Sequence, residues 1–269
     1  AKPQRRDARL YAKCNHECAT KVEQKLERRK YAALVVEPRV QGAAGMVMHP
    51  PGWLKRVAAA ARASGALLIA DEVMTGFGRT GEIFAGRKEK VTPDFLCLAK
   101  GLTGGYLPMA ATLTTQPVFD AFLGEYEEFK TFFHGHSYTS NQLGAAAALA
   151  SWELLTDPKA RARRRALEKA FGKELETLWD FVAVGDVRRE GLVAGVELVA
   201  DWKKRKAFPL KAQAGIRVCE AMARRGVLTR PIGNVVPLLP PYCTTDAQLR
   251  RMVKALRESV VEVLGGERI

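Results

Sequence analysis

The 269-residue chain contains no long apolar run and has far fewer acidic than basic residues. Its apolar runs, such as residues 66–70, are much shorter than the roughly 18 apolar residues that a membrane-spanning helix needs. The first residues are basic and contain no apolar segment typical of a secretion signal. We therefore expect a cytoplasmic protein with no membrane partner. With 47% hydrophobic and 27% charged residues, the composition is typical of a folded globular protein.

The sequence has only five cysteines, and most of them are scattered. An odd number without regular spacing fits a reducing compartment better than a disulfide framework. Three potential metal ligands, Cys14, His16 and Cys18, do lie close together in the sequence. A structural zinc site needs four ligands, usually as separated pairs, and no second pair follows at a usual spacing. We expect no metal site.

The shortage of acidic residues leaves 43 Lys and Arg against 29 Asp and Glu, a formal net charge of +14. A basic nucleic-acid-binding module would bind DNA or RNA in a salt-sensitive way. However, the positive residues are spread along the chain, and the densest run, residues 161–165, has a helical composition without interleaved aromatic residues. A solvated helix face explains this run better, so we expect no nucleic-acid partner.

Short apolar runs alternate with helical segments, which is typical of an α/β fold with a sheet that is at least partly parallel. The runs at residues 32–37, 66–73, 95–100 and 110–114 resemble strands buried inside a sheet. From these patterns we predict four parts: a basic helical segment at 1–30, part of a large sheet-based domain at 31–155, a connecting helix at 156–183 and a small α+β domain at 184–269.

Three of the predicted strands end in a charged residue, namely Glu37, Asp71 and Lys100, and glycine-rich chain follows each one. Ligands of open α/β sheets bind beyond the carboxyl ends of the strands, so these groups are expected to converge. The glycine-rich stretches match neither a P-loop nor a dinucleotide fingerprint. A lysine near a carboxylate instead indicates Schiff-base chemistry. A carboxylate facing a pyridine nitrogen would keep pyridoxal phosphate protonated. The alternative for Lys100 is a surface lysine at a strand end. We expect Glu72, which follows Asp71, to be a structural partner.

Residues 71–81, followed by residues 98–105, resemble the signature of class III, fold type I aminotransferases. The resemblance implies an α/β fold of the aspartate-aminotransferase type, with a large cofactor-binding domain that is incomplete at its N-terminus and a small α+β C-terminal domain. It also implies pyridoxal 5'-phosphate as cofactor and a homodimer with shared active sites. Residues 37–46, 133–142 and 228–233 are similar to members that aminate 8-amino-7-oxononanoate to 7,8-diaminononanoate in biotin biosynthesis. The implied amino donor is S-adenosylmethionine, with lysine as an alternative.

The resemblance also implies roles for individual residues around the cofactor. Lys100 would hold the cofactor covalently and then transfer the proton during catalysis. Asp71 would pair with the pyridinium nitrogen, and Val73 would pack on one face of the ring. His136 and Ser137 would bind the cofactor phosphate of the neighbouring subunit.

For the substrate, the resemblance implies three further positions. Gly135 would lie beside the substrate, and Arg230 would bind the carboxylate of the oxo-acid with its guanidinium fork. Glu37 would orient groups in the active site. A plain salt bridge at Arg230 and a structural role for His134 and His136 are the alternatives.

The members of this family begin with a long N-terminal stretch that supplies a phosphate-binding loop and an aromatic ring over the cofactor. Residues 1–30 do not replace it, so the chain resembles the C-terminal part of the enzyme and is expected to bind cofactor poorly by itself. Two other functions stay open: another class III ω-amino-acid aminotransferase, and a truncated, non-catalytic remnant.

Overall fold

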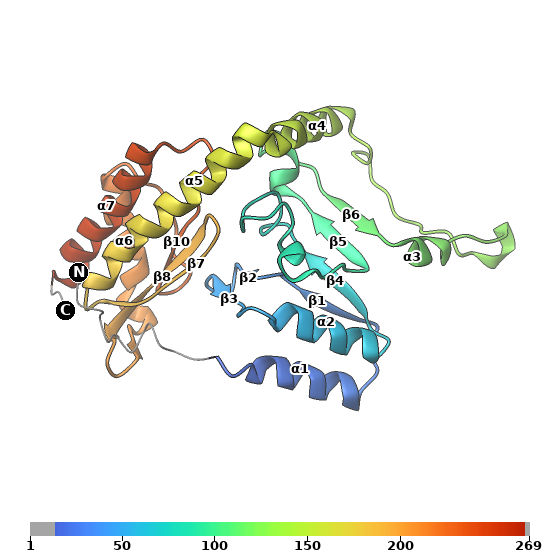
Figure 1. The fold of residues 1–269 in the computed structure, drawn as a ribbon, viewed down its shortest axis with the longest axis horizontal. Helices are drawn as coiled ribbons and strands as arrows, with labels where there is room; N and C mark the ends of the chain where they lie inside the picture. Colours follow the sequence, from blue (N-terminus) through green and yellow to red (C-terminus); the bar gives the residue numbers. More distant parts are fainter. Residues whose placement is uncertain (1–13, 267–269) are drawn as a thin grey trace. The chain divides into compact units, whose positions relative to one another are not determined.

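The computed structural model describes residues 14–266, which form two compact units (Figure 1). The N-terminal unit contains residues 16–39 and 49–161, and the C-terminal unit contains residues 40–48 and the chain from residue 162 onward. The contacts thus group residues 40–48 with the later part of the chain, whereas the sequence places them in the part at 31–155.

The N-terminal unit is built on a four-stranded sheet with the order β1-β4-β5-β6 (Figure 1). The first three strands are parallel, and the last one pairs antiparallel with β5. The predicted mixed α/β sheet is therefore confirmed, with one antiparallel edge. Its strands are β1 (Ala33–Val36), β4 (Leu67–Asp71), β5 (Phe95–Leu98) and β6 (Ala111–Thr114).

Two amphipathic helices, α1 (Glu17–Arg28) and α2 (Trp53–Ala63), pack against each other in this unit. The apolar residues of α2 recur on one face, and this face is buried. Burial of a side chain as large as Leu54 contributes about 2 kcal/mol. The indole Nε1 of Trp53 donates to Cys18 Sγ at 3.0 Å, and this bond joins the two helices.

In the rest of the N-terminal unit, short 3-10 helices and two α-helices follow the strands along the chain. The Asn141 side chain caps α4 by accepting the N–H of Gly144 at 3.0 Å. Pro158 at the start of α5 separates the two helices, as its missing N–H and fixed φ favour a first helical position. The elements are η2 (Ala85–Glu89), η3 (Lys100–Thr103), α3 (Gln116–Asp120), η4 (Tyr126–Glu128) and α4 (Gln142–Thr156). Helix α5 (Pro158–Leu175) begins in this unit and continues into the C-terminal unit.

The C-terminal unit contains an antiparallel sheet with the order β10-β8-β7, and β9 pairs with the other end of β8. The last helix has an apolar stripe that is buried at Leu249, Val253, Leu256 and Val260 and half-buried at Met252. This stripe joins a single core with the sheet and with Phe171. The elements are η5 (Glu176–Asp180), β7 (Val184–Glu190), β8 (Val193–Asp201), β9 (Lys206–Ala207), η6 (Leu210–Ala212), α6 (Ala214–Arg224), β10 (Val235–Leu238) and α7 (Asp246–Leu264).

A short hairpin, β2 (Val40–Gln41) and β3 (Val47–Met48), belongs to the C-terminal unit and is fixed to it by Arg188 of β7. The guanidinium donates to the carbonyl oxygen of Gly45 at 2.6 Å and to that of Met46 at 2.8 Å. The same group forms ion pairs with Asp186 and Glu197. One side chain therefore links the hairpin turn to the sheet.

No helix in the described range 14–266 is long and apolar enough to cross a membrane.

Candidate active site

The strand register brings the predicted strand-end residues to one edge of the N-terminal sheet. Val36 pairs with Ala70, so Glu37, the next residue, is level with Asp71. Asp71 in turn pairs with Cys97 on β5, and Lys100 follows that strand. Because β1, β4 and β5 are parallel, their carboxyl ends share this edge, which is where open α/β sheets bind ligands.

Asp71 is half-buried at the end of β4. Its Oδ1 atom accepts the backbone N–H of Val73 at 3.0 Å, a short-range bond that fixes the carboxylate to its own turn. Within residues 14–266, Oδ2 has no hydrogen-bond partner. Asp71 therefore offers an oriented carboxylate oxygen to a cationic N–H donor.

Lys100 is exposed and begins the short helix η3. Its backbone has a φ of +46°, in the left-handed region that residues with a side chain rarely adopt. The amine forms no hydrogen bond or ion pair with another residue of the described chain. An amine without a partner at a strand end is available to react with a carbonyl group.

Glu72, the neighbour of Asp71, has a different environment. Its side chain is buried, and the carboxylate accepts the backbone N–H groups of Ala85 at 2.6 Å and Gly86 at 2.9 Å. Burial raises the pKa of Glu72, and these two hydrogen bonds oppose that rise. The structural role predicted for Glu72 is thus the one observed.

Gly135, His136 and Ser137 lie in an exposed segment between α3 and α4. This segment extends away from the sheet beyond α3 and then returns to α4 (Figure 1). The N–H of Tyr138 donates to His136 Nδ1 and the N–H of His136 donates to Thr139 Oγ1, both at 3.1 Å, so the turn is locally ordered. In the described chain, no hydrogen bond connects this turn to the strand-end residues.

The same segment exposes large aromatic side chains to solvent. Phe133 and Tyr138 are each 78% exposed, and Phe129 is 70% exposed. Several large apolar side chains exposed on one segment are typical of an interaction site in a folded protein.

Arg230 belongs to the C-terminal unit and lies just before the turn that leads into β10. The turn is closed by paired backbone hydrogen bonds between Ile232 and Val235 and by a 2.8 Å bond from Thr229 Oγ1 to the carbonyl oxygen of Pro237. Arg230 is exposed, and its guanidinium has no carboxylate partner within the described residues. The plain salt bridge that the sequence left as an alternative is therefore not formed there.

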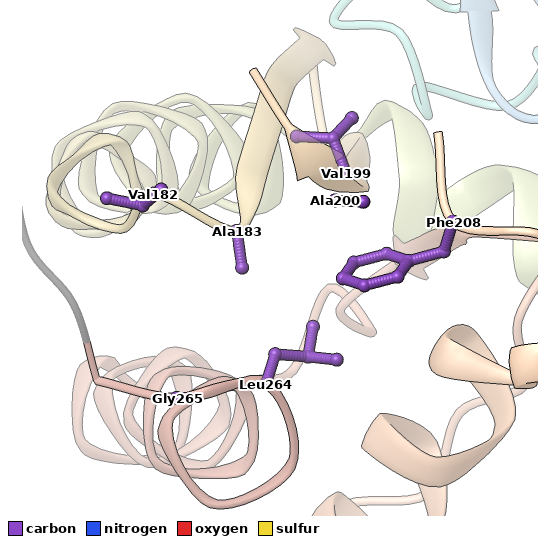
Figure 2. A pocket seen from close by; sticks show the side chains of 7 residues that line it. All are labelled: Val182, Ala183, Val199, Ala200, Phe208, Leu264 and Gly265. Carbon is purple, nitrogen blue, oxygen red and sulfur yellow. The ribbon is translucent and has the colours of Figure 1, made fainter. Parts of the chain in front are cut away.

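Among the described residues, neither a metal centre nor the pocket of Figure 2 offers an alternative to the strand-end edge as the ligand site. Within residues 14–266, no group of three or more His, Cys, Asp or Glu side chains is arranged to hold a metal ion, Cys14, His16 and Cys18 included. Figure 2 shows a pocket in the C-terminal unit. Its volume is about 100 Å³, well below the roughly 300 Å³ at which ligand sites begin. It is lined by Val182, Ala183, Val199, Ala200, Phe208, Leu264 and Gly265.

Comparison with known sequences identifies the family. The model of the family "Aminotransferase class-III" matches residues 3–260. The adenosylmethionine-8-amino-7-oxononanoate aminotransferase of Geobacter sulfurreducens is 45% identical over 257 residues, which is 95% of this chain and 57% of that protein. The enzyme of the same name from Nitratidesulfovibrio vulgaris is 44% identical over 93% of this chain and 46% of its own length. The chain thus spans about half the length of the curated relatives it matches.

Solved structures share the fold. The crystal structure of the Methanocaldococcus jannaschii adenosylmethionine-8-amino-7-oxononanoate aminotransferase has a TM-score of 0.89 and 41% identity, with 92% of this chain and 58% of that chain covered. A PMP-bound aminotransferase from Vibrio fluvialis has a TM-score of 0.86 and 26% identity, with 95% of this chain and 59% of that chain covered. These matches confirm the predicted fold type I. Since the residues around Lys100 and the fold that carries them both agree with one family over nearly the whole chain, the protein belongs to the class-III aminotransferases.

Proposed function

We propose that the complete protein is a pyridoxal-phosphate-dependent aminotransferase that converts 8-amino-7-oxononanoate to 7,8-diaminononanoate in biotin biosynthesis. The observation that carries this proposal is that one edge of a sheet holds both the Lys100 amine and Oδ2 of Asp71, each without a hydrogen-bond partner within residues 14–266. The acceptor is proposed from the names of relatives that are 44–45% identical. A small-molecule biosynthetic role fits the cytoplasm, as do the five free cysteines.

The residues at the sheet edge fit pyridoxal phosphate. An exposed amine at Lys100 suits an aldehyde, and the open oxygen of Asp71 suits the protonated nitrogen of a pyridine ring. Val73 follows Asp71 and is half-buried, which suits an apolar contact with one ring face. When bound, the cofactor supplies an electron sink for the transfer of the amino group.

The chain's own residues then have distinct tasks. Asp71 keeps its position through the Val73 N–H and holds a proton on the ring nitrogen. The amine of Lys100 would accept and return the proton at the reacting carbon, for which hydrogen-bond reach is required. Glu37, level with Asp71 on β1, orients groups at the same edge.

Recognition of the substrate and the cofactor phosphate is assigned to residues outside this edge. Arg230 binds the substrate carboxylate, because a guanidinium fork matches a carboxylate in geometry and charge. Gly135 lies beside the substrate, and His136 and Ser137 bind the cofactor phosphate of a neighbouring subunit. The exposed aromatic segment around them favours a homodimer with shared active sites. Sedimentation equilibrium should then give twice the mass of one chain, and a monomer mass would oppose the shared site.

An amino-transfer assay with mass-spectrometric detection of 7,8-diaminononanoate tests the function. Purified protein with pyridoxal phosphate and 8-amino-7-oxononanoate is offered S-adenosylmethionine in one reaction and lysine in another, which also decides the donor. Product in either reaction is the expected result. Amination of other ω-oxo acids but not of this acceptor would point to another class III enzyme, and no amination of any acceptor would point to a remnant.

Arg230→Lys should raise the KM for the acceptor about tenfold with a smaller change in kcat, because the charge remains while the bidentate fork is lost. The matched control is Arg224→Lys, at an exposed arginine of the same unit that pairs with Glu262. This control should leave both constants unchanged. An unchanged KM in the Arg230 variant would remove Arg230 from the substrate site.

A further inference from the structure

The buried carboxylate of Glu72 closes a loop that begins at the cofactor-side end of β4. The side chain is 1% exposed, and its two oxygens accept the N–H groups of Ala85 and Gly86, 13 and 14 residues further along the chain. The backbone N–H of Glu72 donates to the carbonyl oxygen of Cys97 at 3.0 Å, which ties the start of the loop to β5. Residues 72–86 therefore form a closed loop anchored to the two central strands.

This loop carries Phe77, which is 5% exposed and has a φ of +56°. A bulky residue in the left-handed region persists only where its surroundings fix it. Its ring contacts Phe84 edge-on, with a centroid distance of 5.8 Å, next to the residues that bind Glu72. The contacts that close the loop therefore lie next to the contact that holds the Phe77 ring in place.

Phe77 lies directly against Gly101, the residue after Lys100. A Cβ atom at Gly101 would be 2.8 Å from Cβ of Phe77 and 3.0 Å from Cδ2, so only glycine fits there without a shift. From α4, Ser151 Oγ donates to the carbonyl oxygen of Gly101 at 3.1 Å. The residue next to the reactive lysine is therefore held by a ring from one loop and a hydroxyl from a helix.

We propose that Glu72 is a positioning residue for Lys100: by closing loop 72–86, it seats Phe77 against Gly101 and keeps Lys100 in its left-handed conformation. The inference rests on the proposed role of Lys100, since the placement of an exposed lysine would otherwise be irrelevant. Small displacements of a reacting group cost much of its catalytic effect. A lysine on a flexible stem depends on its backbone for this placement.

The chemistry of the closure requires a carboxylate. Two N–H donors from Ala85 and Gly86 need two acceptor atoms, and a carboxylate is acceptor-only. Glu72→Gln keeps the size of the side chain but turns one acceptor into an NH₂ group facing an N–H donor. The substitution should open the loop with little change in volume.

Hydrogen–deuterium exchange of the cofactor-free chain, read by peptide mass spectrometry, tests the inference without any enzymatic turnover. The reporters are the amides of Leu102 and Gly104, which donate to Ala99 and Gly101 within the turn that begins at Lys100. In Glu72→Gln, exchange of these amides should become at least about tenfold faster, while α2 and the sheet of the C-terminal unit keep their rates. Faster exchange everywhere, or no change at residues 98–106, would overturn the inference.

Two further variants make the outcome specific. Phe77→Ala removes the ring from Gly101 but leaves Glu72 and its donors in place, so it should reproduce the effect at residues 98–106. This variant decides the question if Glu72→Gln does not fold, and unchanged exchange in it would contradict the proposed route. Glu89→Gln is the matched control, because the Glu89 side chain is 8% exposed and also accepts a backbone N–H, that of Lys55 at 2.9 Å. It should affect the start of α2 and leave residues 98–106 unchanged.

The exchange experiment can fail or succeed independently of the proposed function of Lys100. Exchange at residues 98–106 reports whether Glu72 positions the turn, whereas cofactor attachment to Lys100 is read independently by chemical trapping. A localised exchange effect without trapping would refute the function of Lys100 and leave the structural linkage intact.

Discussion

At the end of β4, the neighbouring carboxylates of Asp71 and Glu72 have different roles. Side chains alternate between the two faces of a strand, so Asp71 and Glu72 point to different sides. Asp71 keeps an oxygen available at the sheet edge, whereas Glu72 is buried against backbone amides. The sequence predicted the position of Asp71 from the strand-end pattern. It gave no sign of Phe77 or Ser151, because their contacts with Gly101 connect separate elements and follow no local spacing.

His49 provides a residue-scale prediction for the pH dependence of stability. Burial, aided by the charge of Arg39 and opposed by Glu89, lowers the pKa of His49 from 6.5 to about 4. The unfolded state therefore binds more protons than the folded state between pH 4 and 6.5, so stability falls as the pH falls through this window. The shift in pKa corresponds to a loss of at most about 3 kcal/mol in the free energy of unfolding across this window.

The measurement is urea unfolding at a series of pH values. His49→Phe keeps an aromatic ring against Trp53, whose centroid lies 3.9 Å away, and should flatten the dependence between pH 4 and 6.5. His134→Phe, at an exposed histidine, is the control and should keep the slope of the unmodified chain. A slope that survives in the His49 variant would show that another group causes it.

At the scale of elements, apolar runs and helical periodicity predicted the strands of the N-terminal sheet and the long helices, because the spacing of apolar side chains follows the local secondary structure. The hairpin at residues 40–48 was not predicted as part of the C-terminal unit. Its attachment depends on Arg188, more than 140 residues away in the chain, and on two backbone carbonyls that carry no sequence signal. Long-range pairing of this kind is invisible to local patterns.

Arg188→Lys should therefore lower the free energy of unfolding by about 2 kcal/mol, since the amine cannot serve both carbonyl oxygens and both carboxylates. Urea unfolding measures the change, and exchange of residues 45–47 should increase with it. Arg224→Lys, at an exposed ion pair, should stay within about 0.5 kcal/mol of the unmodified chain. Equal losses in the two variants would show that the fork of Arg188 has no special part in fixing the hairpin.

At the scale of the whole molecule, large apolar side chains remain exposed on the N-terminal unit. Val35 on β1 is 64% exposed, Leu113 on β6 is 53% exposed, and Leu149 and Leu154 on α4 are 68% and 73% exposed. Sequence periodicity predicted that such residues occur in strands and helices. It does not say which faces stay uncovered, since that depends on what else packs there. These surfaces and the exposed aromatic segment are consistent with a chain that spans about half the length of its relatives.

The central claim is that Lys100 is the residue that binds pyridoxal phosphate. Borohydride reduction of the protein mixed with pyridoxal phosphate, followed by peptide mass mapping, tests it most directly. We expect a reduced adduct that is confined to Lys100 and lost in Lys100→Ala, with the other lysines unlabelled in both. An adduct at a different lysine, or none on a folded protein that shows its native circular dichroism, would rule out Lys100 as the cofactor-binding residue.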